Sequence, residues 1–145
     1  MGKKYQYFEL DEFINSPTAK KKGIDNTPSF EVVEHLDELV EKILDPLRAA
    51  YGMSIRVTSG YRCPALNKAV GGSDTSVHQI GYAADLQVGG SFDKFVAFVK
   101  DWFLKTGTKF DQLLIEKNKS GERWVHIGLK NNSGQQRGQI KLMEA

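Results

Sequence analysis

The stretch FDQLLIEKNKSGERWVHIGL, residues 110–129, carries the pattern that decides the fold. Its flanks FDQLLIE and RWVHIGL are rich in β-branched and aromatic residues, and a polar KNKSG segment separates them, which predicts a β-hairpin. Side chains on a strand alternate between two faces, so Val125 and Ile127 belong to a core face. Trp124 and His126 then point the opposite way. One of the three histidines in the chain is therefore expected on the open face of a sheet.

The rest of the chain predicts the elements that complete this sheet and cover it. SIRVTSG and AADLQV alternate in the same way and indicate two further strands. Apolar periodicity predicts helices over ELDEFINS, from Thr27-Pro28 to about residue 50 with a kink near Pro46, and from Ser91 to near Gly107. PTAKKKGIDNTP is expected to be a polar connection with a solvated lysine run. The Gly- and Gln-rich tail from Asn131 has a last apolar stretch, IKLM, for which no strand is predicted. The order of helices, strands, helix and hairpin predicts an α+β fold, an antiparallel sheet with helices packed on one face.

Composition limits the class of protein. The 145 residues, 40% of them hydrophobic and 26% charged, predict one globular domain over residues 1–145. A net charge of +2 is too small to indicate a nucleic-acid partner, and no apolar run reaches membrane-spanning length. The single Cys63 excludes an internal disulfide framework and a CxxC zinc site. No secretory signal follows the start, so we expect a protein that is cytoplasmic as synthesised. The sequence gives no indication of oligomeric state.

Two neighbouring strands offer an aspartate and a histidine to one surface. Asp85 lies opposite the core face of its strand, as His126 does, and His78 lies on the loop just before it. Two histidines and one carboxylate leave a fourth tetrahedral position on zinc, the pattern of a catalytic site. The same ligands also form the facial triad of non-haem iron enzymes, and carboxylate–histidine pairs occur without any metal. Cys63 with a histidine base is a thiol-protease alternative, although nothing marks that thiol as activated. The third histidine, His35, lies beside the apolar stripe of its predicted helix and is expected to be a surface residue and not a ligand.

Three motifs in register resemble one enzyme family. SVHQIGYAAD, residues 76–85, resembles the signature Ser-x-His-x-x-Gly-x-Ala-x-Asp of the zinc D-Ala-D-Ala carboxypeptidases and their L-alanyl-D-glutamate endopeptidase relatives. TSGYRCPALN resembles the segment that precedes it in that family, and WVHIGL the strand that bears the last ligand. FELDEFINS and ILDPLR look similar to a compact phage and bacterial subgroup. The resemblance implies the fold and zinc geometry that this family shares with lysostaphin-type peptidases and the hedgehog signalling domain.

The resemblance also implies roles for single residues. His78, Asp85 and His126 would hold one zinc ion per chain. Arg62 would bind a substrate carboxylate or stabilise the oxyanion, because a guanidinium makes a two-point contact that lysine cannot. Ser76 would either contact the substrate or only turn the loop. The alternative for Arg62 is a surface arginine that pairs with Asp74.

The general base is the point where the chain departs from the family pattern. The family carries Glu or Asp three residues before its final histidine, and this chain has Arg123 there. Glu116 ends the partner strand and can face the same side as His126, whereas Glu122 lies in the predicted turn. We expect Glu116 to be the base, with Glu122 as the second candidate.

The expected function is therefore zinc-dependent hydrolysis of a peptidoglycan stem peptide, of the D-Ala-D-Ala carboxypeptidase or L-Ala-D-Glu endopeptidase type. A chain without its own signal suits a phage or prophage lysin that a holin-type partner releases through the membrane, or a dipeptidase inside the cell. Two rivals stay open. One is a catalytically weak or inactive zinc-containing binding module, as the hedgehog domain exemplifies, and the other is a structural phage protein.

Overall fold

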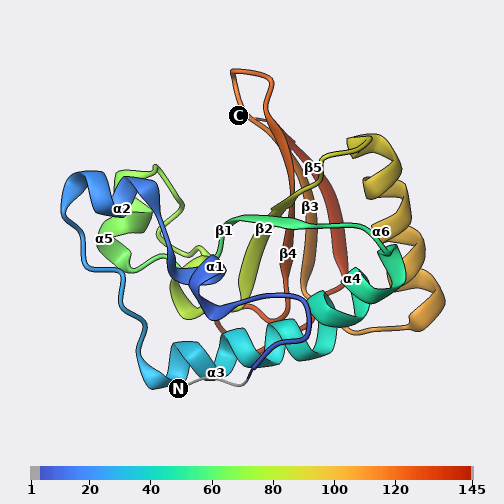
Figure 1. Ribbon diagram of the computed structural model, residues 1–145, viewed down its shortest axis with the longest axis horizontal. Helices are drawn as coiled ribbons and strands as arrows, with labels where there is room; N and C mark the ends of the chain where they lie inside the picture. The colour runs from blue at the N-terminus through green and yellow to red at the C-terminus, as the bar shows by residue number, and fades with distance from the viewer. Residues whose placement is uncertain (1–3, 145) are drawn as a thin grey trace.

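A five-stranded sheet forms the centre of the computed structural model, which describes residues 4–144. The strands lie in the order β1-β2-β4-β3-β5 (Figure 1). Neighbouring strands are antiparallel except for β3 and β5, which are parallel. Their bounds are β1 Arg56–Ser59, β2 Ala83–Gln87, β3 Gln112–Lys117, β4 Arg123–Gly128 and β5 Gln139–Glu144. The predicted α+β class is confirmed, and the β3–β4 hairpin lies where the sequence places it.

Strand β5 extends the sheet beyond the sequence prediction, which left the IKLM tail without a strand. Gln112, at the start of β3, pairs with Gly128 at the end of β4 and with Gln139 at the start of β5. The chain therefore leaves β4 beside the start of β3 and begins β5 at the same end. This connection makes β5 parallel to β3, so the sheet is mixed and not wholly antiparallel.

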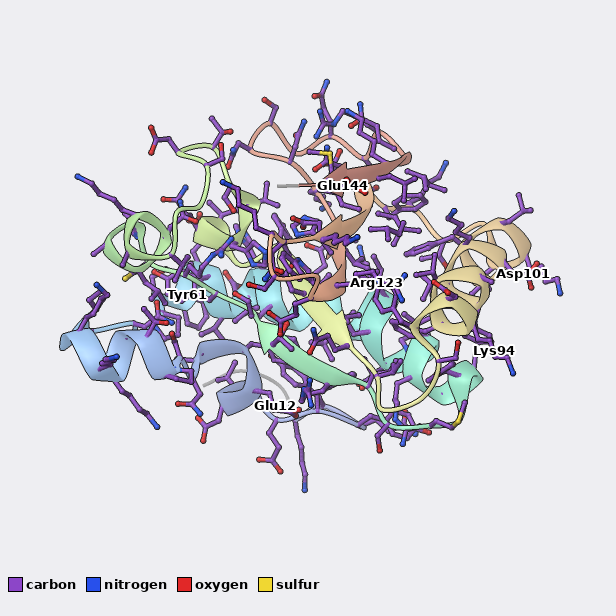
Figure 2. The ribbon with its side chains drawn as sticks, turned by 90° about the horizontal axis from the view of Figure 1, so that it is seen from above. Glu12, Tyr61, Lys94, Asp101, Arg123 and Glu144 are labelled. Carbon is purple, nitrogen blue, oxygen red and sulfur yellow. The ribbon has the colours of Figure 1, made fainter. Side chains whose placement is uncertain are left out.

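Helices cover one face of the sheet and one of its ends. Figure 1 shows α3 and α4 running across the sheet and α6 beside them, with the short helices α1, α2 and α5 gathered at the other side. In Figure 2, Tyr61 lies on the side of the short helices, opposite Lys94 and Asp101 of α6. The bounds are α1 Leu10–Ile14, α2 Pro17–Lys22, α3 Phe30–Leu39, the π-helical turn η1 Val40–Leu44, α4 Asp45–Tyr51, α5 Pro64–Ala69, the 3-10 turn η2 Val77–Ile80 and α6 Phe92–Thr106.

The hydrophobic core lies between the sheet and the long helices. Leu86 and Ala84 of β2 and Val125 and Ile127 of β4 are completely buried, which confirms the predicted core face. They join one cluster with fully buried side chains of the helices, among them Leu36, Leu39, Ile43, Leu47, Phe95 and Val99. The opposite face of β2 and β4 is therefore free to carry polar groups.

The helices differ from the sequence prediction in three places: an additional helix, α2, the start of α3, and the turn before α4. PTAKKK forms helix α2, because Ser16 Oγ accepts from the Ala19 N–H at 3.2 Å and Pro17 stands in the first turn. Helix α3 is capped by Ser29 and not by Thr27, whose hydroxyl donates to Asp25 at 2.6 Å instead. The break expected near proline 46 is the π-helical turn η1 just before it, where the Asp45 N–H reaches the Val40 carbonyl. No helix within residues 4–144 is long and apolar enough to cross a membrane.

Candidate metal centre and active site

Three side chains from two strands and one turn meet on the open face of the sheet. Asp85 of β2 and His126 of β4 are direct cross-strand partners, so their side chains lie next to each other. His126 Nδ1 lies 3.0 Å from Asp85 Oδ1, and His78 Nε2, from the turn η2, lies 3.2 Å from the same oxygen. All three side chains are buried. The structure therefore brings together the three residues that the sequence predicts to converge.

The backbone orients His78 through one nitrogen of its ring and through the turn that carries it. Its Nδ1 lies 2.7 Å from the carbonyl oxygen of Gly60, which can only accept, so the imidazole donates there. That tautomer leaves Nε2 with a free lone pair directed at Asp85. Gly81, at φ +86°, ends the turn η2 in the left-handed region. A Cβ at Gly81 would also lie 2.8 Å from the carbonyl oxygen of Val32, so glycine is required there on both counts.

The donor chemistry of this group fits a divalent metal such as zinc. One ligand atom from each of His78, Asp85 and His126 lies within 4.8 Å of the others. Burial alone would raise the pKa of Asp85, but attraction to the two neighbouring imidazoles outweighs it and holds that pKa well below its usual range. Burial lowers the pKa of His78, against the attraction of Asp85. An ionised carboxylate beside a neutral imidazole is the protonation state that metal binding requires.

A cavity of about 720 Å³ opens above these three residues. His78, Asp85 and His126 line it together with Glu116 and Arg62. Further wall is supplied by the loop that precedes η2 and by the loop that follows β4. A group that could hold a metal therefore lies in the wall of an accessible cavity large enough for several residues of a peptide.

Glu116 lies beside the histidine–aspartate group without belonging to it. Its Oε1 is 3.7 Å from His126 Nδ1. Glu116 faces Trp124 directly across the strand pair, so both side chains are on the face that carries His126. Burial and the negative charge of Asp85 raise the pKa of Glu116 above its ordinary value. A carboxylate whose proton affinity is raised next to a metal site is suited to accept a proton.

Arg62 enters the cavity from the segment after β1. Its backbone N–H donates to the His78 carbonyl at 3.0 Å, and its Nη2 lies 3.4 Å from Ser76 Oγ. Its Nε is buried and has no hydrogen-bond partner among residues 4–144. The pairing of Arg62 with Asp74, the alternative for a surface arginine, is not the contact that the side chain makes. A guanidinium with a buried, unsatisfied N–H is prepared to bind an oxyanion or a carboxylate.

The model of one family, described as Peptidase M15, matches residues 6–128. The chain belongs to the peptidase M15 family. M15 peptidases are zinc enzymes, so the family and the histidine–aspartate group agree on the metal. A search of the curated proteins found no match. The resemblance inferred from the sequence motifs is confirmed by the match over most of the chain, which includes all three candidate ligands, Arg62 and both candidate bases.

Glu122, the second candidate for the base of this M15 peptidase, lies away from the other site residues. It is exposed in the β3–β4 turn, and its Oε1 accepts from Asn118 Nδ2 at 3.2 Å. The Glu122 N–H donates to Asn118 Oδ1 at 2.9 Å, so both groups serve the turn. The local geometry favours Glu116 over Glu122, and its role as base stays a prediction.

Two other residues that the sequence singled out lie outside the cavity. Cys63 is half-buried and packs against the hydrophobic core, which leaves no support for a thiol nucleophile. His35 stacks on Tyr82 with ring centroids 4.0 Å apart, and its Nδ1 lies 2.6 Å from the Ile80 carbonyl oxygen. The prediction that His35 is not a metal ligand agrees with these contacts, although the residue is half-buried and not fully on the surface.

Asn26 positions the arginine segment and was missed in the sequence, where it lies in the supposed polar connection. Its Nδ2 donates to the carbonyls of Ile14 and Tyr61, at 2.8 and 3.0 Å, and its Oδ1 accepts from the Cys63 N–H at 2.8 Å. The buried amide thus brackets Arg62 on both sides. These contacts span up to 37 residues of sequence, so no local pattern could signal them.

Proposed function

We propose that this chain is a zinc-dependent peptidase that hydrolyses a peptidoglycan stem peptide, by the D-Ala-D-Ala carboxypeptidase or the L-Ala-D-Glu endopeptidase reaction. The single observation that carries the proposal is the pairing of two features in one cavity. A buried histidine–aspartate–histidine group offers a metal three ligands, and a separate carboxylate, Glu116, lies 3.7 Å from one of them. Three protein ligands with a neighbouring carboxylate are the pattern of hydrolytic and not of structural zinc sites.

His78, Asp85 and His126 are the proposed ligands of one zinc ion. Bound there, zinc would lower the pKa of a water molecule to about 7 and would polarise the scissile carbonyl. Asp85 stays ionised and His78 presents Nε2, because the Gly60 carbonyl holds the proton of that ring on Nδ1. These protein groups thus fix the charge and the orientation of the site before substrate arrives.

Glu116 is the proposed general base. It accepts a proton from the attacking water and delivers it to the amine of the leaving peptide, a role that asks for a pKa above that of an ordinary glutamate. Its position supports this, because burial and Asp85 raise its pKa while its carboxylate stays beside the ligand His126. The water oxygen forms the new bond to the carbonyl carbon, the C–N bond breaks, and the departing nitrogen takes the proton that the water gave up.

Arg62 and Ser76 are the proposed substrate contacts. The buried, unpartnered Nε of Arg62 would donate to the oxyanion as it forms or to a substrate carboxylate. Ser76 Oγ lies 3.4 Å from Arg62 Nη2 and orients the guanidinium by accepting from that nitrogen. Its hydroxyl already accepts from the His78 N–H at 3.3 Å, so Ser76 links the arginine to the first ligand.

Release of new amino groups from purified peptidoglycan tests this function. The zinc-loaded protein is expected to release them, and the protein stripped of zinc is not. Mass spectrometry of the digested muropeptides then identifies the bond, since loss of a terminal D-alanine and separation of L-alanine from D-glutamate give different masses. A protein that binds one zinc and releases no amino group from any wall type contradicts the proposal and favours the binding module.

A further inference from the structure

The loop of residues 131–137 connects β4 to β5 and forms part of the cavity wall. Asn131, Asn132, Ser133 and Arg137 of this loop line the same cavity as the candidate metal ligands. The family match ends at Gly128. This wall of the cavity therefore comes from a part of the chain that the family model does not cover.

The 131–137 loop is fixed at both ends by ion pairs to distant elements. Lys130, just before it, reaches Glu38 of α3 at 3.0 Å. At the other end, Arg137 Nε and Nη2 bind the two carboxylate oxygens of the buried Asp111 at 2.7 and 2.8 Å. The Arg137 N–H also donates to Asp111 Oδ1 at 3.1 Å. A two-point contact to a buried carboxylate is among the stronger polar interactions in proteins, so the base of this loop is held firmly.

Hydrogen bonds hold the 131–137 loop in shape and join it to a second loop of the cavity wall. Asn131 Oδ1 accepts from the N–H groups of Ser133 and Gln135, at 2.9 and 2.8 Å. Asn132 Nδ2 donates to the Thr75 carbonyl at 2.9 Å, and Thr75 lines the cavity from the loop that precedes η2. The two loops are therefore joined in the cavity wall by the contact between Asn132 and Thr75.

The lining of the cavity combines charged and uncharged groups. Arg62, Glu116 and the candidate metal ligands supply charged or ionisable groups. The 131–137 loop contributes the amides of Asn131 and Asn132, the hydroxyl of Ser133 and Arg137, whose charge is paired with Asp111. Hydrogen-bonding groups without net charge select a partner of the same kind, because a buried ion there would lack a counter-charge.

We propose that the 131–137 loop is the substrate-selecting wall of this site, and that it takes an uncharged, amide-bearing part of the substrate. This inference rests on the proposed peptidase function. In peptidoglycan such amides belong to the peptide backbone and to the N-acetyl groups of the sugars. Asn132 is a direct contact in this account, and Arg137 with Asp111 are positioning residues that hold the wall in place.

Binding and turnover of two probes test the inference. The probes are a free stem pentapeptide and the same peptide attached to its N-acetylated disaccharide. Binding is measured by calorimetry on zinc-free protein, where no turnover occurs, and kcat and KM on the zinc-loaded protein. Asn132→Ala removes the bridge, Arg137→Gln removes the anchor, and Arg137→Lys restores the charge without the two-point contact.

Asn118→Ala is the matched control. Asn118 closes the β3–β4 turn at the opposite end of β4 with the kind of contacts that Asn131 makes inside the 131–137 loop, an Oδ1 that accepts from a backbone N–H and an Nδ2 that donates to a side-chain oxygen. Like Asn132, it is an asparagine that holds a loop, but it lies outside the cavity. The control should match the wild type in binding and kinetics. Loop variants should keep their zinc while Kd and KM rise roughly 2- to 12-fold, the value of one net hydrogen bond, with kcat nearly unchanged. Arg137→Lys should recover part of the loss.

The two probes separate the sources of the amide. If Kd and KM of the loop variants rise only for the disaccharide-peptide, the 131–137 loop binds the N-acetyl groups of the sugar. If they rise equally for both probes, the loop binds the peptide backbone. Loop variants that bind both probes like the wild type overturn the inference, as does a wild type that binds neither. If the zinc-free wild type binds a probe and the loop variants weaken that binding, but the zinc-loaded protein cleaves nothing, the wall stands and the peptidase function fails.

Discussion

Replacement of Glu116 by glutamine separates catalysis from folding. Glutamine keeps the shape and a hydrogen bond but cannot accept a proton, so general-base catalysis should fall by roughly 10²–10⁴ in kcat. This loss corresponds to about 2.7–5.4 kcal/mol of transition-state stabilisation. The fold should not suffer. Burial and the charge of Asp85 raise the pKa of Glu116, which means that the folded state disfavours its ionised form. Removing that charge should therefore leave the melting temperature of the metal-free protein unchanged or slightly higher.

The assay is steady-state release of amino groups from muropeptides, with zinc content and thermal unfolding measured on the same preparations. Glu122→Gln is the matched control. The Glu122 carboxylate stabilises the β3–β4 turn, so this substitution should cost little activity. A Glu116→Gln protein with wild-type kcat would refute the assignment. Loss of activity in Glu122→Gln instead would show that the turn rearranges when substrate binds. If Glu116→Gln also lost its zinc, the carboxylate would be a ligand and not the base.

Three further substitutions probe the surroundings of the site. Arg62→Lys should fold normally and lose roughly 1.5–3 kcal/mol of transition-state stabilisation in kcat/KM; kinetics equal to the wild type would remove Arg62 from the site. Gly60→Ala would place a Cβ 2.5 Å from the Phe13 carbonyl oxygen and should lower the free energy of unfolding by about 1–3 kcal/mol. In the control Gly128→Ala the new Cβ would have no neighbour nearer than 3.7 Å, so its stability should not fall. Equal melting temperatures for the two variants would contradict the close approach at Gly60. Glu38 has a pKa of about 2 in the fold because hydrogen bonds from two lysines and a tyrosine outweigh its burial, so its contribution to stability is complete above its ordinary value of 4.5 and disappears as the pH falls towards 2. Glu38→Gln should therefore be less stable than the wild type at neutral pH, and the difference should shrink between pH 4.5 and 2; a difference that does not change with pH would show that the ion pairs of Glu38 contribute nothing.

Alternation along the strands made the sheet and the centre of the site predictable from the sequence. A period of two places Asp85 and His126 opposite the core residues of their strands, and the hairpin fixes which face Glu116 joins. Asp85 and His126 then need only to be on neighbouring strands to meet, which the register of β2 and β4 provides. The pattern is local, and the consequence is a contact across 41 residues of sequence.

The remaining features depend on contacts that local patterns do not encode. Helix α2 has one buried residue, Ala19, so it shows no apolar periodicity and is recognised by its serine cap and its terminal glycine. Strand β5 is largely exposed, and it becomes a strand because β3 offers it a free edge. The 131–137 loop is fixed by the contact of Arg137 with Asp111, 26 residues away. The presence of an arginine and an aspartate in the sequence does not indicate that these two residues pair.

Zinc content of the wild type and of the His126→Ala variant decides whether His78, Asp85 and His126 hold the metal. We expect one zinc per wild-type chain after equilibration with the metal and removal of the excess. Most of this zinc should be lost from His126→Ala, which keeps only two of the three ligands and leaves the ionised Asp85 with one histidine partner. His35→Ala, which removes a histidine outside the cavity, should retain the full zinc content. Full occupancy in a folded His126→Ala protein, or no zinc in the wild type, would contradict the account.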